Sequence, residues 1–152
     1  MSAYESDELD ELKKLAENGD AEAQNILGAR LITGQYVKQD ILGGFYWYCQ
    51  AIKQGYIHAK WNAGSMLVNG DDGIEKNEML GMRLIQEAAD GNENSACLFI
   101  SHCYVTGSYA KEKNEVLAKV WERRAWDYKN LKLFNQPIDL EVEYDLRLDK
   151  PE

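Results

Sequence analysis

The chain has 152 residues, and its 26 acidic residues outnumber its 17 basic residues, which gives a formal net charge of -9 at pH 7. A field of this sign repels phosphate backbones and anionic membrane surfaces, which argues against nucleic acid and membrane as partners. The acidic N-terminus lacks an apolar core, and no run of about eighteen apolar residues occurs, so we expect an unexported, cytoplasmic protein of one domain.

Apolar residues recur at helical spacing along most of the chain. The expected helices cover residues 8–18, 20–33, 40–54, 56–69, 77–90, 93–106 and 114–130. The first of them, with Ser6 or Asp7 as its N-cap and Gly19 just beyond its end, has the form of a half-repeat that caps a stack of helices.

The rest of the helical pattern repeats. Two series of glycines share a step of 36 or 37 residues: Gly19, Gly55 and Gly91, and Gly34, Gly70 and Gly107. The second helix of each copy opens at a residue whose side chain accepts hydrogen bonds from free backbone N–H groups: Asp40, Asn77 and Asn114. One helix pair cannot bury its apolar face alone, so we expect three stacked repeats, at about 20–55, 56–91 and 92–130.

Glycines also fall inside the predicted second helices. Gly44 and Gly81 occupy the same repeat position, which Ala118 holds in the third copy. A glycine inside a helix costs about 1 kcal/mol relative to alanine, so its presence there indicates that two helices approach closely.

The first copy resembles the Sel1-like repeat family, a relative of the tetratricopeptide repeat with a slightly longer period. The resemblance is carried by Asp20-Ala21-Glu22-Ala23-Gln24-Asn25-Ile26-Leu27-Gly28, then Gly34, Val37, Asp40, Gly44, Trp47-Tyr48, Ala51 and Gly55. The other copies keep a looser version, and the resemblance covers residues 8–130. It implies an all-α, right-handed α-solenoid of stacked antiparallel helix pairs over residues 1–136, whose concave side receives a protein or peptide.

Chemically active residues form no recognised catalytic or metal-binding motif. Cys49, Cys97 and Cys103 lack metal-ligand spacing with His58 and His102, so we expect buried free cysteines, no metal and no cofactor. The acidic segment 69–73 is interpreted as a turn, because Val68 and Gly70 would occupy calcium-ligand positions. The cysteines do not recur at one repeat position, unlike those of secreted, disulfide-bonded members of the family.

The side of each first helix that faces away from its second helix is expected to bind a partner. The expected partner-binding residues are Glu22, Asn25, Ala29 and Ile32 in the first copy, His58, Trp61, Asn62, Ser65 and Asn69 in the second, and Leu98, His102 and Thr106 in the third. An alternative interpretation places Trp61 and Leu98 in the core, because aromatic and large apolar residues serve both purposes.

The C-terminal segment, residues 137–152, follows a different period. Its apolar residues alternate with charged ones: Ile138, Leu140, Val142, Tyr144, Leu146 and Leu148. A period of two predicts an extended, acidic tail over residues 138–148. Such a tail must lie against its own solenoid, pair with a second copy or join a sheet of a partner.

These patterns, taken with the resemblance, predict a non-catalytic protein-interaction module. The expected role is a small cytoplasmic bacterial adaptor, or an immunity protein that neutralises a toxin, with a basic toxin or a signalling protein as partner. Two alternatives are an enzyme with the weak hydrolase activity claimed for some secreted relatives and a structural homodimer joined through the tail.

Overall fold

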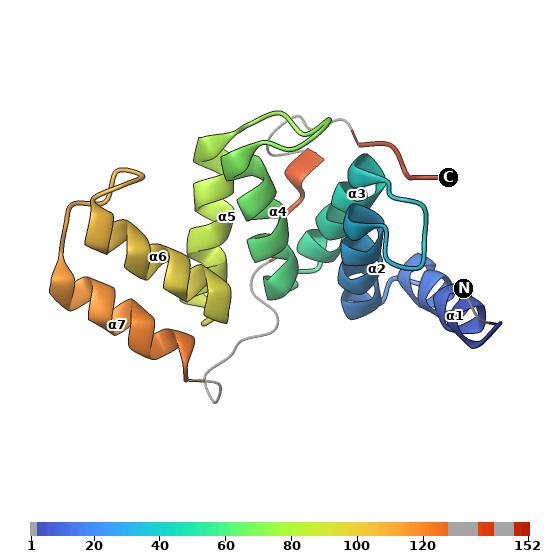
Figure 1. Cartoon of the computed structure of the whole chain (residues 1–152), viewed down its shortest axis with the longest axis horizontal. Helices are drawn as coiled ribbons and strands as arrows, with labels where there is room; N and C mark the ends of the chain where they lie inside the picture. Colours follow the sequence, from blue (N-terminus) through green and yellow to red (C-terminus); the bar gives the residue numbers. More distant parts are fainter. Residues whose placement is uncertain (1–2, 128–136, 142–147) are drawn as a thin grey trace.

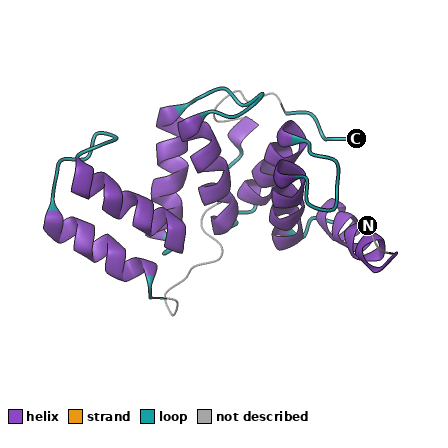
Figure 2. Ribbon diagram, viewed as in Figure 1, coloured by secondary structure: helices purple, strands orange, loops and turns teal. Residues whose placement is uncertain are grey.

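The computed structural model describes residues 3–127, 137–141 and 148–152, which form an all-α stack (Figures 1 and 2). Its helices are α1 (Ala3–Glu17), α2 (Ala21–Thr33), α3 (Ile41–Lys53), α4 (Ile57–Asn69), α5 (Glu78–Asp90), α6 (Asn94–Thr106) and α7 (Glu115–Ala125). The described residues contain no strand; Asp71 and Ile74 form an isolated bridge that closes the turn predicted at 69–73. No helix in the described part of the chain has the length and hydropathy needed to span a membrane.

The helices alternate between two roles. We call α2, α4 and α6 the A helices and α3, α5 and α7 the B helices. Each A helix packs most extensively against the B helix that follows it, and α3 and α5 also pack against the next A helix. Helix α1 packs on α2 at one end of the stack and α7 lies at the other end (Figure 1). The described part of the chain is therefore an α-solenoid of three helix pairs preceded by one additional helix.

The predicted N-caps of the B helices are confirmed. Side-chain oxygens of Asp40, Asn77 and Asn114 accept hydrogen bonds from backbone N–H groups three residues ahead, at 2.8, 3.1 and 3.0 Å. The prediction that Ser6 or Asp7 caps the first helix is wrong, because α1 already begins at Ala3 and contains both residues.

The last predicted helix is also shorter than expected. Helix α7 ends at Ala125, and the backbone N–H of Trp126 closes it by donating to the carbonyls of Arg123 and Arg124. Residues 128–130, which were included in the predicted helix, lie outside the described residues.

Glycines let the two helices of each of the first two repeats cross at close range. A Cβ atom at Gly28 would lie 2.9 Å from the carbonyl oxygen of Gly44, and a Cβ atom at Gly64 would lie 3.0 Å from that of Gly81. In the third repeat the hydroxyl of Ser101 donates to the carbonyl of Ala118 at 2.8 Å. The predicted close approach of A and B helices is thus present, and a serine–alanine pair replaces the glycines in the last repeat.

The described part of the tail contradicts the predicted strand at two residues. Leu140 and Glu141 are helical, and residues 142–147, which include Val142, Tyr144 and Leu146, lie outside the described residues. The physical reason is that Leu140 is fully buried among helices, in a core cluster with Ile52 and Leu84, where no neighbouring strand offers a ladder of hydrogen bonds.

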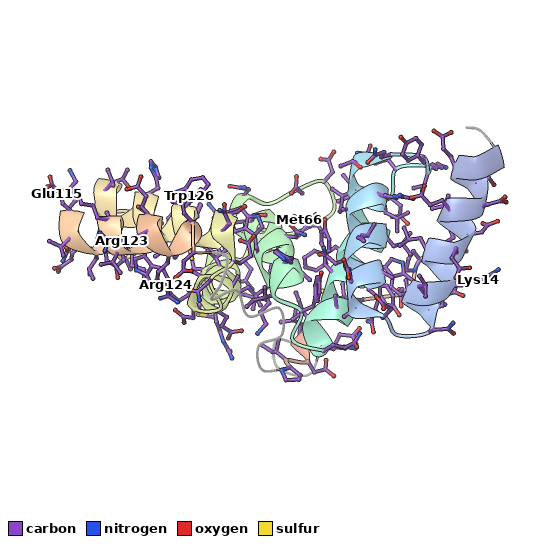
Figure 3. All side chains as sticks on the ribbon, turned by 90° about the horizontal axis from the view of Figure 1, so that it is seen from below. Lys14, Met66, Glu115, Arg123, Arg124 and Trp126 are labelled. Atoms are coloured by element: carbon purple, nitrogen blue, oxygen red, sulfur yellow. The ribbon has the colours of Figure 1, made fainter. Side chains whose placement is uncertain are left out.

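The tail lies against its own solenoid. The N–H of Ile138 donates to the carbonyl of Ile52 at 3.4 Å, and Nζ of Lys53 lies 2.9 Å from Oε2 of Glu141. Residues 140–141 lie between α3 and α5 in both Figure 1 and Figure 3, on the side of the stack formed by these two B helices. Of the docking modes left open by the sequence, the described residues show the intramolecular one.

Candidate functional site

The outward side chains of the A helices form one surface, which we call the A face. Its members are Glu22, Asn25, Ala29, Thr33, His58, Trp61, Asn62, Ser65, Asn69, Ser95, Leu98, His102 and Thr106, and each is at least partly exposed. The three helices that carry them occupy the same place in successive repeats, so the surface continues along the stack.

Side chains join neighbouring A helices across this face. Nδ2 of Asn62 on α4 donates to Oδ1 of Asn25 on α2 at 2.9 Å. One repeat later, the ring of Trp61 packs against Phe99 of α6 with centroids 6.0 Å apart, and Phe99 in turn packs against Tyr109. These contacts hold the A helices in a fixed relation, so the A face is a preformed surface.

His58 connects the second and third repeats. Its Nδ1 lies 3.4 Å from Oε1 of Glu93, while Oε2 of Glu93 accepts the N–H of Ala96 at 2.7 Å and thereby caps α6. The side chain of Glu93 is buried, whereas that of His58 remains partly exposed. The ring of His58 also lies beside that of Tyr56, with centroids 5.8 Å apart.

Three hydroxyl groups of the A face donate to carbonyls of their own helices. Ser65 donates to the carbonyl of Asn62, Thr33 to that of Ala29, and Thr106 to that of His102, each at 2.9 Å. A hydroxyl that has committed its hydrogen still offers acceptor lone pairs. Together with the carboxylate of Glu22, these groups place hydrogen-bond acceptors on the A face.

Ile32, a predicted member of the face, packs against α3. The side chain of Ile32 points at α3, where its Cγ1 lies 2.7 Å from the place a Cβ atom at Gly44 would take. The reason is helical geometry, because Ile32 follows Gly28 by four residues and therefore shares the stripe that crosses α3. Both interpretations offered for Trp61 and Leu98 hold, since each is partly exposed and each packs against the core cluster that contains Ile57, Ile85 and Ile100.

Two features of the region were missed. Phe99 was not predicted on the A face, although it holds the same repeat position as Asn62 and contacts the preceding A helix in the same way. Lys60 is only 1% exposed, and its Nζ lies 2.9 Å from Oε2 of Glu87 on α5. The signal for Lys60 is its repeat position, because Lys60 aligns with Cys97, which the sequence predicts to be buried, and the structure shows the equivalent Gln24 and Cys97 buried as well.

At the repeat position shared by Gln24, Lys60 and Cys97, the first and third residues bond to the preceding helix. Nε2 of Gln24 donates to the carbonyl of Ala16, and Sγ of Cys97 donates to that of Ala89, so each fastens an A helix to the preceding helix. In the second repeat the equivalent carbonyl, that of Ile52, accepts the N–H of Ile138 from the tail.

The three cysteines have raised thiol pKa values, which makes them weak nucleophiles. Burial raises the pKa of the Cys49 thiol far above its ordinary range, and it raises the pKa of Cys97 to about 11. Burial is also the main cause that raises the pKa of Cys103, and all three cysteines are free. A raised pKa leaves little thiolate at neutral pH, so these cysteines have the character of packing residues. The described residues contain no group of three or more potential metal ligands.

Comparison with known proteins gives matches over the whole repeat region. A family model described as Sel1 repeat matches residues 21–56, 57–93 and 94–125. The crystal structure of a Sel1 repeat protein from Oxalobacter formigenes is similar, with a TM-score of 0.66 and 28% identity over 81% of this chain and 93% of that one. A protective antigen of uropathogenic Escherichia coli with an SLR fold gives a TM-score of 0.67 and 26% identity over 77% of this chain, which spans only 25% of that protein. No curated protein matches the chain.

Proposed function

The chain belongs to the Sel1 repeat family, whose members mediate protein–protein interactions, and we propose that it is a non-catalytic module that binds another protein through its A face. The observation that carries this proposal is the contact between successive A helices. The Asn25–Asn62 hydrogen bond and the Trp61–Phe99 packing make one continuous, partly exposed surface with an aromatic residue at its centre. Exposed aromatic residues surrounded by polar groups are typical of interface hot spots.

The chemistry of the A face favours a basic partner. Its hydroxyl groups and Glu22 offer acceptors, and lysine and arginine side chains bring only donors. The net charge of -9 would also attract such a partner over a distance of about one Debye length, roughly 8–10 Å. A basic toxin or a basic region of a signalling protein fits this description.

The proposed setting is the bacterial cytoplasm, and the proposed roles are an adaptor or an immunity protein. Three free, buried cysteines suit a reducing compartment, in which thiols persist. The two roles differ in an observable way, because an immunity protein restores growth when it is co-produced with its toxin, whereas an adaptor has no such effect.

Capture of the partner with two matched variants tests the proposal. Ser65→Arg places a bulky positive charge in the middle of the A face, and Met79→Arg places the same group on the exposed surface of α5. We expect the wild-type chain and Met79→Arg to retain a partner from the native organism and Ser65→Arg to lose it. Equal retention of the partner by all three proteins would contradict the proposal that the A face binds it. Substrate turnover abolished by changing His58 or His102 would contradict the non-catalytic assignment.

A further inference from the structure

A groove lies between α1 and α2 at the N-terminal end of the stack. It has a volume of about 400 Å³, and its apolar walls are Leu12 and Leu15 from α1 and Ile26 from α2. Leu15 is 44% exposed and Ile26 is 38% exposed. We call this groove the end slot.

The α1 wall of the end slot corresponds to a helix face that is buried in the B helix α3. Helix α1 precedes α2 as a B helix precedes the next A helix, and a step of 36 residues places Leu12 and Leu15 at the positions of Tyr48 and Ala51. Both of these α3 residues are buried, and the ring of Tyr48 lies against Gly28 of its own A helix. Helix α1 has no A helix of its own among the described residues, so Leu15 remains open.

The α2 wall is Ile26, which occupies a repeat position at which α4 and α6 contact the preceding A helix. The same step places Ile26 at the position of Asn62, and a further step of 37 residues, the length of the second repeat, leads from Asn62 to Phe99. Asn62 bonds to Asn25 and Phe99 packs on Trp61, each in the preceding A helix. The walls therefore meet where the A helix of a repeat before α2 would lie.

The charge around the end slot selects the kind of occupant. Its rim carries the carboxylates of Asp7, Glu8 and Glu11, of which Glu8 forms an ion pair with Arg30 at 2.7 Å. Asp7 and Glu11 are exposed and face solvent beside the apolar walls. A second copy would bring its own acidic α1 against this rim, which costs free energy through like-charge repulsion.

The geometry points to the end slot as a docking site for an amphipathic helix of another protein, with an apolar stripe flanked by lysine or arginine. The helix takes the place of an A helix in front of α1, with its apolar stripe on Leu12, Leu15 and Ile26. Its basic residues lie beside Asp7 and Glu11. This site is at the end of the stack, and it is additional to the binding proposed for the A face.

The test titrates the full chain with an amphipathic leucine–lysine peptide of about 15 residues, near the shortest length at which an isolated helix persists. Two control peptides share its length: one with the leucines scrambled off a single face, and one with glutamate in place of lysine. Amide chemical shifts locate binding, and fluorescence anisotropy measures affinity. We expect shifts confined to α1 and α2 and clearly tighter binding of the amphipathic lysine peptide than of either control.

Variants of the chain make the test specific. Leu15→Gln combined with Ile26→Gln removes the apolar walls at partly exposed sites and should weaken binding at least about tenfold, whereas Val116→Gln, at an exposed apolar residue of α7, should leave it unchanged. Asp7→Asn with Glu11→Gln should weaken binding at low salt and have little effect at high salt.

Three outcomes would overturn the end slot as proposed. The first is equal binding of the scrambled lysine peptide, and the second is binding that survives loss of Leu15 and Ile26. The third is concentration-dependent dimerisation that Leu15→Gln abolishes, which would assign the slot to a second copy. None of these results concerns the partner capture with Ser65→Arg. Failure of the end-slot proposal can therefore be distinguished from failure of the A-face proposal.

Discussion

Gly81 on α5 faces Gly64 on α4 so closely that a Cβ atom at Gly81 would lie 2.8 Å from the carbonyl oxygen of Gly64. The same Cβ atom would lie 2.8 Å from the backbone nitrogen of Val68. Both neighbours are backbone atoms, so a methyl group can be accommodated only if the helices move apart. The repeat thus uses glycine to set the distance between its two helices.

Gly81→Ala should therefore destabilise the protein, although alanine is the better helix former. Overpacking costs about 1–3 kcal/mol, whereas the gain in helix propensity is about 1 kcal/mol. We expect the free energy of unfolding in urea to fall by up to about 2 kcal/mol. Ala118→Gly at the equivalent position is the matched variant and should cost about 1 kcal/mol through propensity alone. A stabilised Gly81→Ala protein would show that the crossing tolerates a methyl group.

The buried tail residue Leu140 should contribute to stability. It is 0% exposed, and replacing a buried leucine with alanine removes transfer free energy and leaves a cavity, so Leu140→Ala should cost about 2–5 kcal/mol. Asp139→Ala, at the exposed neighbour whose carboxylate lies 3.9 Å from Lys53, should cost less than about 1 kcal/mol. Thermal unfolding of both variants provides the comparison.

Truncation after Gln136 tests what the tail does for binding. The described tail residues bond to α3 and, through Lys150, to Glu17 of α1. The A face is formed by outward side chains of α2, α4 and α6, so we expect a lower melting temperature with unchanged partner affinity. Tighter partner binding by the truncated chain would instead show that the tail competes for the A face.

Trp61→Ala should weaken partner binding by at least about 2 kcal/mol, the usual threshold for a hot spot. Stability should fall as well, because Trp61 also packs against Phe99. Calorimetric titration of the captured partner, corrected for the folded fraction, separates the two effects. Trp126→Ala, at a tryptophan 59% exposed just after α7, serves as the control and should leave affinity unchanged. Unchanged affinity per folded Trp61→Ala molecule would assign this residue to the core alone.

Glu87→Gln should destabilise the second repeat because it removes the negative charge that lies 2.9 Å from the buried ammonium of Lys60. Losing one partner of a fully buried pair costs about 3–5 kcal/mol, and the partial exposure of Glu87 lowers the expected cost to about 1–3 kcal/mol. Adding Lys60→Met should restore most of the loss, since the buried charge is then gone. Arg83→Gln, which removes the exposed partner of Glu87, should change stability by about 0.5 kcal/mol or less. A neutral Glu87→Gln variant would contradict the role of this ion pair.

Stability should decrease at alkaline pH. Burial raises the pKa of Tyr48 from 10.0 to about 12 and that of Cys97 from 9.0 to about 11. The unfolded chain releases these protons at lower pH than the folded chain, so the stabilisation is complete below pH 9 and is lost as pH rises toward 12. Urea unfolding at neutral pH and at pH 11 measures the loss, and Tyr48→Phe should reduce it. A free energy of unfolding that stays constant over this range would contradict the expected linkage.

Much of the fold could be predicted from the sequence because it depends on local or periodic properties. The glycine step marks the repeat length, and Asp40, Asn77 and Asn114 each cap a helix through an N–H group only three residues away. Helix, cap and turn need no information about distant residues, and the repeated unit implies its own stacking. The family and the A helices that form the A face follow from the same evidence.

Other features depended on which surfaces meet in three dimensions. Period two predicted a strand at residues 138–148, but Leu140 is helical and buried where the space between two B helices accepts an apolar side chain. Ile32 and Ile26 are equally apolar in the sequence, yet one packs on α3 and the other borders the end slot. The spacing of side chains in the sequence determines which residues share a helix face. Which segment packs against that face depends on contacts between parts of the chain that are far apart in sequence, so only the tertiary structure decides it.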